Sequence, residues 1–209
     1  MTTSTLDHLV YATPDLAAGV DRISTLLDVV AVPGGQHPGR GTRNALVRLG
    51  PRSYLEIVGP DAAQPPPDGP RWFGVDKLTG PRLAGWAAAS PDVAAAAANA
   101  RREGLLLGSV GFGRRTRADG VELAWRFTDP TVVAADGLVP FLIDWGTSPH
   151  PALSAPDGAV ILQLRAEHPD PSLVERYFRI VGVDMEVSQA AAPALVARVR
   201  TRSGEVELR

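Results

Sequence analysis

The chain has 209 residues, 44% of them hydrophobic and 21% charged, and a formal net charge of −2 at pH 7. This composition predicts a globular protein with a sizeable core, and the weak negative charge argues against a nucleic-acid-binding protein. The absence of cysteine excludes disulfides and thiolate chemistry. No apolar run is long enough to cross a membrane, and Met1–Thr5 lacks the pattern of a secretory signal, so we expect a cytoplasmic protein.

One short phrase recurs along the chain at nearly constant spacing. It reads Thr13-Pro14-Asp15-Leu16, then Ser90-Pro91-Asp92-Val93, and more loosely His168-Pro169-Asp170. Each copy follows a strand-like run and precedes a segment with helical spacing. Repetition over tens of residues indicates a repeated architecture. We therefore expect an α+β protein in which a βαβββ unit is built twice, and a third, shorter unit with a similar order of elements.

The first unit, at about residues 5–60, begins with a strand at 6–12. Thr13 is expected to cap the following helix, with Pro14 at the first helical position. Pro33-Gly34-Gly35 is expected to end this part and lead into a glycine-rich loop. Residues 44–49 and 53–58 then alternate as two strands of a hairpin.

The second unit, at about residues 81–150, follows a proline-rich linker at 61–80. A strand at 83–89, a cap at Ser90 and an alanine-rich helix at 93–103 repeat the first plan. Later strands are expected at 121–127 and 139–145. The basic run Arg114–Arg117 is expected to be a solvated loop rather than an anion site.

The third unit belongs to an expected C-terminal extension, residues 151–209, after a core at 1–150. A strand at 159–165, an amphipathic helix around Tyr177, and later strands that end in a hairpin at Ser203-Gly204 again give the order β-α-β-β-β. Ordinary α+β proteins also reuse such elements, so the sequence leaves open whether this unit is a true repeat.

Four phrases carry a resemblance to a known superfamily. They are Leu6 to Ala12, Gly34 to Asn44, Tyr54 to Gly59, and Phe141 to Gly146. Together with two tandem βαβββ units they resemble the vicinal oxygen chelate superfamily, most closely its glyoxalase-like branch. The resemblance implies a glyoxalase/bleomycin-resistance/dioxygenase-like cup, in which each module curls its sheet into one half.

The resemblance also implies metal ligands on the first and last strands of each module. His8 and Glu56 match a His/Glu pair suited to Zn, Ni, Mn or Fe. In the second module, Gly85 takes the place of the second histidine and provides no ligand. Asp144 lies beside the position that matches Glu56, and a shift of one residue decides whether it faces the cup or salt-bridges elsewhere. We expect Asp144 to be a metal ligand and, with Glu56, a catalytic group.

A ligand-binding surface is expected from two further groups of residues. The polar, glycine-rich segment from Gln36 to Asn44 is expected at the rim of a pocket, and tryptophans of the second module are expected on its wall, with core packing as the alternative for them. The candidate ligand-binding residues are His37, Thr42, Arg43, Asn44, Trp125 and Trp145.

Two main functions remain open at this point. The first is a divalent-metal-dependent lyase, isomerase or dioxygenase acting on a small oxygen-bearing molecule. The second is a metal-free protein that binds or sequesters a small molecule, as resistance proteins of the superfamily do; the glycine at position 85 favours it. An assembly module that uses the extension as an interface is a third option. The expected partners are a small-molecule ligand and a second copy in a homodimer.

Overall fold

The structure is a computed structural model that describes residues 5–117 and 119–209. Residues 1–4 lie outside the described residues. They make up most of Met1–Thr5, the segment that lacks the sequence pattern of a secretory signal. The first module contains β1 (Thr5–Ala12), α1 (Leu16–Leu27), β2 (Val32–His37), β3 (Thr42–Gly50) and β4 (Ser53–Pro60). The second contains β5 (Arg82–Ala89), α2 (Val93–Arg102), β6 (Val110–Thr116), β7 (Glu122–Thr128) and β8 (Phe141–Asp144). The two expected βαβββ modules are thus confirmed.

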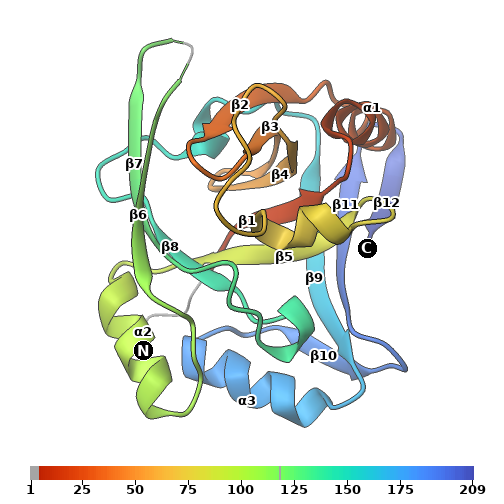
Figure 1. Cartoon of the computed structure of the whole chain (residues 1–209). Helices are drawn as coiled ribbons and strands as arrows, with labels where there is room; N and C mark the ends of the chain where they lie inside the picture. The colour runs from red at the N-terminus through yellow and green to blue at the C-terminus, as the bar shows by residue number, and fades with distance from the viewer. Residues whose placement is uncertain (1–4, 118) are drawn as a thin grey trace.

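The two modules form one eight-stranded sheet, in the order β2-β3-β4-β1-β5-β8-β7-β6 (Figure 1). In each module the first strand pairs in parallel with the last, β1 with β4 and β5 with β8. The modules join where β1 runs antiparallel to β5. The sheet curls so far that its edge strands β2 and β6 touch. Gly35 lies so close to Arg115 that a Cβ would stand 2.6 Å from its Nη1.

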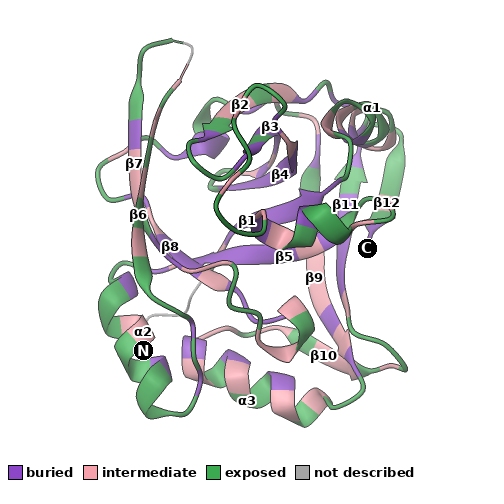
Figure 2. Ribbon diagram, viewed as in Figure 1, coloured by how far each residue is buried: buried purple, intermediate pink, exposed green. Residues whose placement is uncertain are grey.

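Alternation along the central strands separates the two faces of this sheet. Leu9, Ile57 and Trp86 face one side, where they share a continuous hydrophobic core with Ile23 of α1 and with Phe178 of the C-terminal unit. The other face is concave and carries a mixture of aromatic and polar side chains. Figure 2 shows that the central strands are the most buried part of the fold, with exposed residues on the outward sides of the helices.

The repeated Pro-Asp phrase has one structural role in all three copies. The aspartate is the N-cap of the helix, and its Oδ1 accepts a hydrogen bond from a backbone N–H three residues later. Asp15, Asp92 and Asp170 accept from the amides of Ala18, Ala95 and Leu173 respectively. The expectation that Thr13 and Ser90 would be the caps is therefore wrong, because α1 begins at Leu16 and α2 at Val93, directly after the aspartates.

Two strands lie where loops were expected. Residues 32–37 form β2 despite Pro33-Gly34-Gly35, since the pairing with β3 shifts register between Pro33 and Gly35 and so passes the proline. The basic run Arg114–Arg117 overlaps the end of β6, which pairs with β7. Arg115 therefore points to one face of a strand instead of lying in a solvated loop. The expected linker contains a 3-10 helix, η1 (Trp72–Lys77).

The C-terminal unit repeats the order of elements but not their pairing. It contains β9 (Val160–His168), α3 (Pro171–Val181), β10 (Glu186–Gln189), β11 (Ala194–Thr201) and β12 (Gly204–Leu208). These strands form a separate sheet in the order β10-β9-β11-β12. Here the first strand pairs in parallel with the second, whereas β1 and β5 pair with the last strand of their modules. The third unit is therefore no copy of the first two in topology.

The extension packs on the convex side of the cup. The Trp86 ring of β5 meets the Phe178 ring of α3 edge-to-face at 6.2 Å, and its indole N–H donates to the Leu138 carbonyl at 2.7 Å. The Leu83 amide donates to the carbonyl of Arg209 at the end of the chain. Residues on both sides of position 150 therefore share one hydrophobic core. A domain boundary at that position stays a prediction.

Phe178→Leu should lower the free energy of unfolding by about 1–2 kcal/mol, because the aromatic contact with Trp86 is lost from a side chain that is 2% exposed. Chemical denaturation followed by circular dichroism measures the change. Phe112→Leu is the matched control, since Phe112 is 66% exposed and the same replacement there should change stability by less than about 0.5 kcal/mol. Equal effects at the two sites would contradict this packing.

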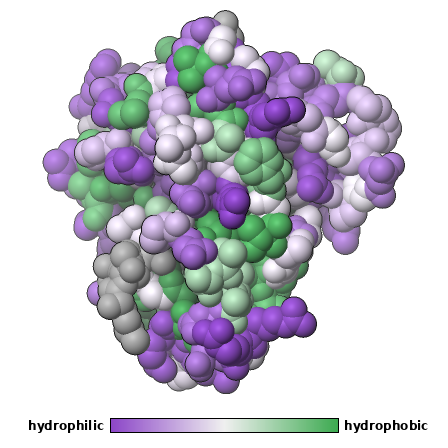
Figure 3. Space-filling view, turned by 90° about the vertical axis from the view of Figure 1, so that its left-hand side faces the viewer, coloured by the Kyte–Doolittle hydropathy of each residue, from purple (hydrophilic) through white to green (hydrophobic). Residues whose placement is uncertain are grey.

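The face that carries the β6–β7 hairpin and α2 shows apolar patches among hydrophilic side chains (Figure 3). None of the helices in the described part of the chain is both long and apolar enough to pass through a membrane.

Candidate active site

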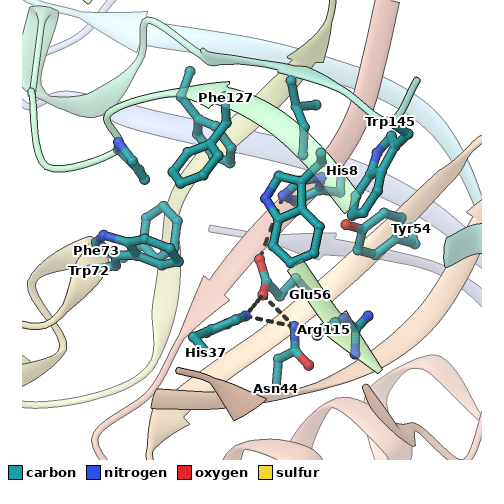
Figure 4. Close-up of a pocket in the computed structure, with 14 residues that line it drawn as sticks. His8, His37, Asn44, Tyr54, Glu56, Trp72, Phe73, Arg115, Phe127 and Trp145 are labelled. Atoms are coloured by element: carbon teal, nitrogen blue, oxygen red, sulfur yellow. Dashed lines mark hydrogen bonds and ion pairs between the residues drawn. The ribbon is translucent and has the colours of Figure 1, made fainter. Parts of the chain in front are cut away.

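The concave face of the sheet encloses a cavity of about 40 Å³. Its floor is polar and its walls are aromatic, and both modules contribute (Figure 4). The polar lining residues are His8, His37, Asn44, Tyr54, Glu56 and Arg115. The others are Trp72, Phe73, Trp125, Phe127, Pro130, Phe141, Ile143 and Trp145. Electrostatic interactions between buried side chains are stronger than they would be in water.

Imidazole and carboxylate groups alternate in a row across the floor. His150 Nε2 lies 3.0 Å from Asp7 Oδ2, and Asp7 Oδ1 lies 2.7 Å from His8 Nδ1. His8 Nε2 is 3.6 Å from Glu56 Oε2, and Glu56 Oε1 is 3.2 Å from His37 Nε2. All five side chains are buried. The row, which we call the His–carboxylate chain, joins β1, β2, β4 and the segment after β8.

Asp7 anchors one end of this chain. The register of β1 against β5 shifts between Leu6 and His8, a bulge that frees the Asp7 side chain from the regular alternation. Asp7 accepts hydrogen bonds from His8, His150 and the indole N–H of Trp145. Burial alone raises its pKa, but the bonds and charges of His150 and His8 outweigh that effect and lower the pKa from 3.8 to about 2. Asp7 is therefore a permanent anion at neutral pH.

The hydrogen bonds of His150 assign its tautomer. The amide of Ala152 donates to His150 Nδ1, so this nitrogen carries a lone pair and Nε2 carries the proton that points to Asp7. Asp7 in turn accepts from His8 Nδ1, which leaves His8 Nε2 directed toward Glu56 and the cavity. An Asp–His pair of this kind orients the ring for proton transfer.

Glu56 occupies the centre of the floor. Burial raises its pKa, but hydrogen bonding and charge from His37, the charge of His8 and the amide of Asn44 prevail and lower the pKa from 4.5 to about 2. The amide Nδ2 of Asn44 donates to Glu56 Oε1 at 2.6 Å. Tyr54 stacks on His8 with ring centroids 4.6 Å apart, and burial, the largest cause, raises the pKa of its hydroxyl well above 10.0. Glu56 is thus ionised and Tyr54 protonated at neutral pH.

The lowered pKa of Glu56 predicts acid sensitivity. A carboxyl group whose pKa is lower in the folded than in the unfolded state stabilises the fold fully above its unfolded value, and the contribution is lost as pH falls toward the folded value. For Glu56 this window runs from 4.5 down to about 2. Between pH 5 and pH 2 the wild type should lose on the order of 3 kcal/mol more stability than Glu56→Gln. Urea unfolding of both proteins across this range measures the difference; parallel losses would count against the assignment.

Three buried polar atoms at the site have no hydrogen-bond partner among the described residues. They are Arg115 Nη1, Trp72 Nε1 and Asn44 Oδ1. Two of them are N–H donors, and a buried donor without a partner is costly unless a ligand or water accepts its hydrogen. Arg115 comes from β6 and Trp72 from η1, and both residues line the cavity. A ligand oxygen in the cavity is one acceptor that would satisfy such donors.

The structure brings together most of the residues expected from sequence. His8, Glu56, His37, Asn44, Trp125 and Trp145 all line the cavity. Thr42 does not line the cavity, but its Oγ1 lies 2.9 Å from His37 Nδ1 and orients the His37 ring. The binding and catalytic roles of these residues stay predictions.

Two expected site residues are not brought to the cavity. Asp144 alternates with Phe141 and Ile143 along β8, and its Oδ1 accepts a hydrogen bond from the amide of Gly146. The strand therefore turns Asp144 away from Glu56, as the register that matches Ile143 with Glu56 requires. Arg43 is exposed on β3, between the inward residues Thr42 and Asn44.

The donor set does not fit the four-ligand metal centre that the resemblance implies. The second module places Gly85 and Ile143 at the matching positions, and neither provides a ligand. Within residues 5–117 and 119–209, no three His, Asp or Glu side chains are grouped so as to hold a metal ion. His8 and His37 meet opposite oxygens of Glu56 rather than one common point.

Several site residues were missed from sequence. Asp7 and His150 make up one end of the His–carboxylate chain, and Arg115 and Trp72 provide the unpaired donors. For Asp7, the available signal was its position next to His8. Strict strand alternation, however, would put these two side chains on opposite faces of the sheet. Arg115 was seen only as part of a basic run, and Trp72 only as part of a linker.

A curled sheet built from two βαβββ modules, with a polar site on its concave face, defines the class: this is the vicinal oxygen chelate fold. Within that class, the model of the glyoxalase-like domain family matches residues 6–181. The chain belongs to this family, and the match extends into the C-terminal unit as far as α3. No curated protein matches the chain.

Comparison with solved structures finds similar chains, among them the following three. A hypothetical protein from Staphylococcus aureus has a TM-score of 0.68 at 12% identity, with 98% of each chain covered. Methylmalonyl-CoA epimerase from Mycobacterium tuberculosis has a TM-score of 0.46 at 22% identity, over 74% of this chain and 95% of its own. The epimerase from Streptomyces coelicolor scores 0.47 at 21% identity, over 72% and 100%. The likeness to the Staphylococcus aureus protein, at 12% identity, concerns the fold alone.

Proposed function

We propose that the protein is an isomerase or lyase that moves a proton at a carbon next to an oxygen-bearing group of a small anionic molecule. The observation that carries the proposal is the meeting of two kinds of group at one cavity. The buried His8–Glu56 pair is equipped for proton transfer, and the unpaired N–H groups of Arg115 and Trp72 are equipped to bind an oxyanion.

In this proposal the substrate oxygen accepts hydrogen bonds from Arg115 and Trp72. Negative charge that develops on this oxygen when the neighbouring carbon loses a proton is stabilised by the guanidinium. His8, held in one tautomer by Asp7, and the Glu56 carboxylate accept and return the proton. The aromatic walls exclude water from the reacting carbon. A cytoplasmic location and a homodimer stay predictions.

A second candidate is metal-free sequestration of an aromatic or apolar molecule. The observation in its favour is the wall of rings: Trp72 contacts Phe127 edge-to-face at 5.7 Å, and Trp125 lies 5.1 Å from Trp145. Such walls stack well on flat ligands. The buried His–carboxylate chain, which costs desolvation energy to maintain, favours proton transfer over binding alone.

The test is exchange of carbon-bound hydrogen with solvent. The protein is incubated in D2O with a panel of small 2-oxo, 2-hydroxy and malonate-type acids, and proton NMR follows loss of the signal next to the carbonyl. Parallel samples contain EDTA or added Zn, Ni, Mn or Fe, and tryptophan fluorescence reports binding. Catalysed exchange supports the proposal, and exchange only with a metal assigns the metal-dependent form. Saturable binding without exchange or conversion supports sequestration instead, and neither signal would refute both candidates.

A further inference from the structure

A second, larger cavity adjoins the site. Its volume is about 270 Å³, against about 40 Å³ for the inner cavity. The two share three lining residues, Phe73, Pro130 and Phe141, which form the partition between them. The outer cavity lies along the N-terminal half of β5, where β5 has no partner on that side because β8 pairs only from Ala87 onward.

The inner cavity is too small to hold a whole substrate. Pockets for small molecules usually measure roughly 300–1,000 Å³, and a single water needs about 10–15 Å³ of such space. The inner cavity has room for a few waters or one functional group. The outer cavity comes close to the lower end of the usual range, and the two cavities together reach it.

The partition contains a residue in a strained conformation. Phe73 is half-buried and adopts φ 58° and ψ 20°, the left-handed region, and Gly74 follows with φ 66°. A phenylalanine rarely adopts this conformation, and such strain concentrates at functional segments. Glycine at position 74 lets the backbone turn here without a second strained side chain.

Gly85 leaves space behind the partition. A Cβ built on Gly85 would meet one atom within 4 Å, Cδ1 of Phe73, at 3.9 Å. The position where the resemblance implies a histidine is thus empty of side chain, and the space opens into the outer cavity, which Gly85 lines. The Phe73 ring therefore borders this space.

The wall of the outer cavity carries three cationic side chains, Arg71, Lys77 and Arg82, against two carboxylates, Asp76 and Asp136. Arg71 is paired with Asp76, and Asp136 with His168. Lys77 and Arg82 also line this cavity, but neither forms an ion pair or side-chain hydrogen bond with another described residue. An acidic group that enters the outer cavity therefore meets two free cations beside the apolar surface of Phe73, Val132 and Val139.

We propose that the outer cavity binds the tail of the substrate, and that the substrate is a flexible-chain organic acid with a second acidic group at its far end. The reacting oxygen-bearing group enters the inner cavity past Phe73. The chain lies on the apolar surface next to Gly85, and the terminal acid pairs with Lys77 and Arg82. This inference rests on the proposed function for the identity of the reacting end.

The experiment compares ligand length and charge across matched variants. Pyruvate, longer straight-chain 2-oxo monoacids and 2-oxo diacids are titrated by calorimetry against the wild type, Gly85→Leu and the double variant Lys77→Gln/Arg82→Gln. Gly69→Leu is the control, since Gly69 has open space around it and lines neither cavity. Circular dichroism verifies that each variant is folded.

Affinity for the wild type is expected to rise with chain length, and more for diacids than for monoacids. Gly85→Leu should lower the affinity for long ligands by about tenfold or more and leave the affinity for pyruvate unchanged. The double variant should lower the ratio of diacid to monoacid affinity by about tenfold. Equal affinity at all lengths, no effect of Gly85→Leu, or no binding by any acid would overturn the inference. If binding depends on ligand length but no carbon-bound hydrogen exchanges with solvent, the tail site is supported and the proposed reaction is refuted.

Discussion

Glu56→Gln is expected to lower kcat by about 10²–10⁴-fold on any substrate that exchanges hydrogen with solvent at this site. Glutamine keeps the shape of the side chain, so Asn44 can still donate to its carbonyl oxygen, as it does to Glu56 Oε1 at 2.6 Å. The negative charge between His8 and His37 is lost, and with it the acceptor and the stabiliser of a protonated imidazole. NMR time courses or coupled assays measure kcat, and fluorescence titration measures whether ligand binding is retained.

Asp144→Asn is the matched control for this prediction. It makes the same change from carboxylate to amide on β8, but its side chain bonds the amide of Gly146 outside the cavity. We expect kcat to stay within about twofold of the wild type, since a barrier change of 1.36 kcal/mol is needed for tenfold. Similar losses in both variants would show that Asp144 takes part in the reaction, and unchanged turnover in Glu56→Gln would exclude Glu56 as the catalytic carboxylate.

The overall fold was accessible from sequence because periodicity and repetition both survive in the chain. The Pro-Asp phrase marked the start of all three helices, although the cap proved to be the aspartate and not Thr13 or Ser90. Local patterns do not determine which strands pair. The third unit accordingly matched the first two in element order, while β9 pairs in parallel with β10 instead of the last strand.

The centre of the site could also be predicted, since His8 and Glu56 lie at inward positions of β1 and β4. The rest depended on long-range geometry. Arg115 reaches the cavity only because the sheet curls until β6 meets β2. His150 reaches Asp7 through a contact across 143 positions, and Trp145 across 138. A one-residue register choice decided the direction of Asp144, and sequence alone does not resolve such a choice.

Asp7 shows how a local irregularity redirects function. In a regular strand its side chain would point away from that of His8. The bulge in β1 instead lets the carboxylate accept from three N–H donors, one on the neighbouring His8 and two on the distant Trp145 and His150. One buried anion therefore fixes the tautomer of a candidate catalytic histidine and ties the segment after β8 to the first strand.

Asp7→Ala should accordingly destabilise the protein by about 3–5 kcal/mol, because it leaves His8, His150 and the Trp145 indole buried without their shared acceptor. Asp92→Ala is the matched control: it removes an exposed helix cap and should cost only about 1 kcal/mol. Asp7→Asn retains one acceptor oxygen and is expected to fall between them. Urea denaturation at pH 7 gives all three values. If Asp7→Ala proves no worse than Asp92→Ala, the carboxylate does not hold the His–carboxylate chain together.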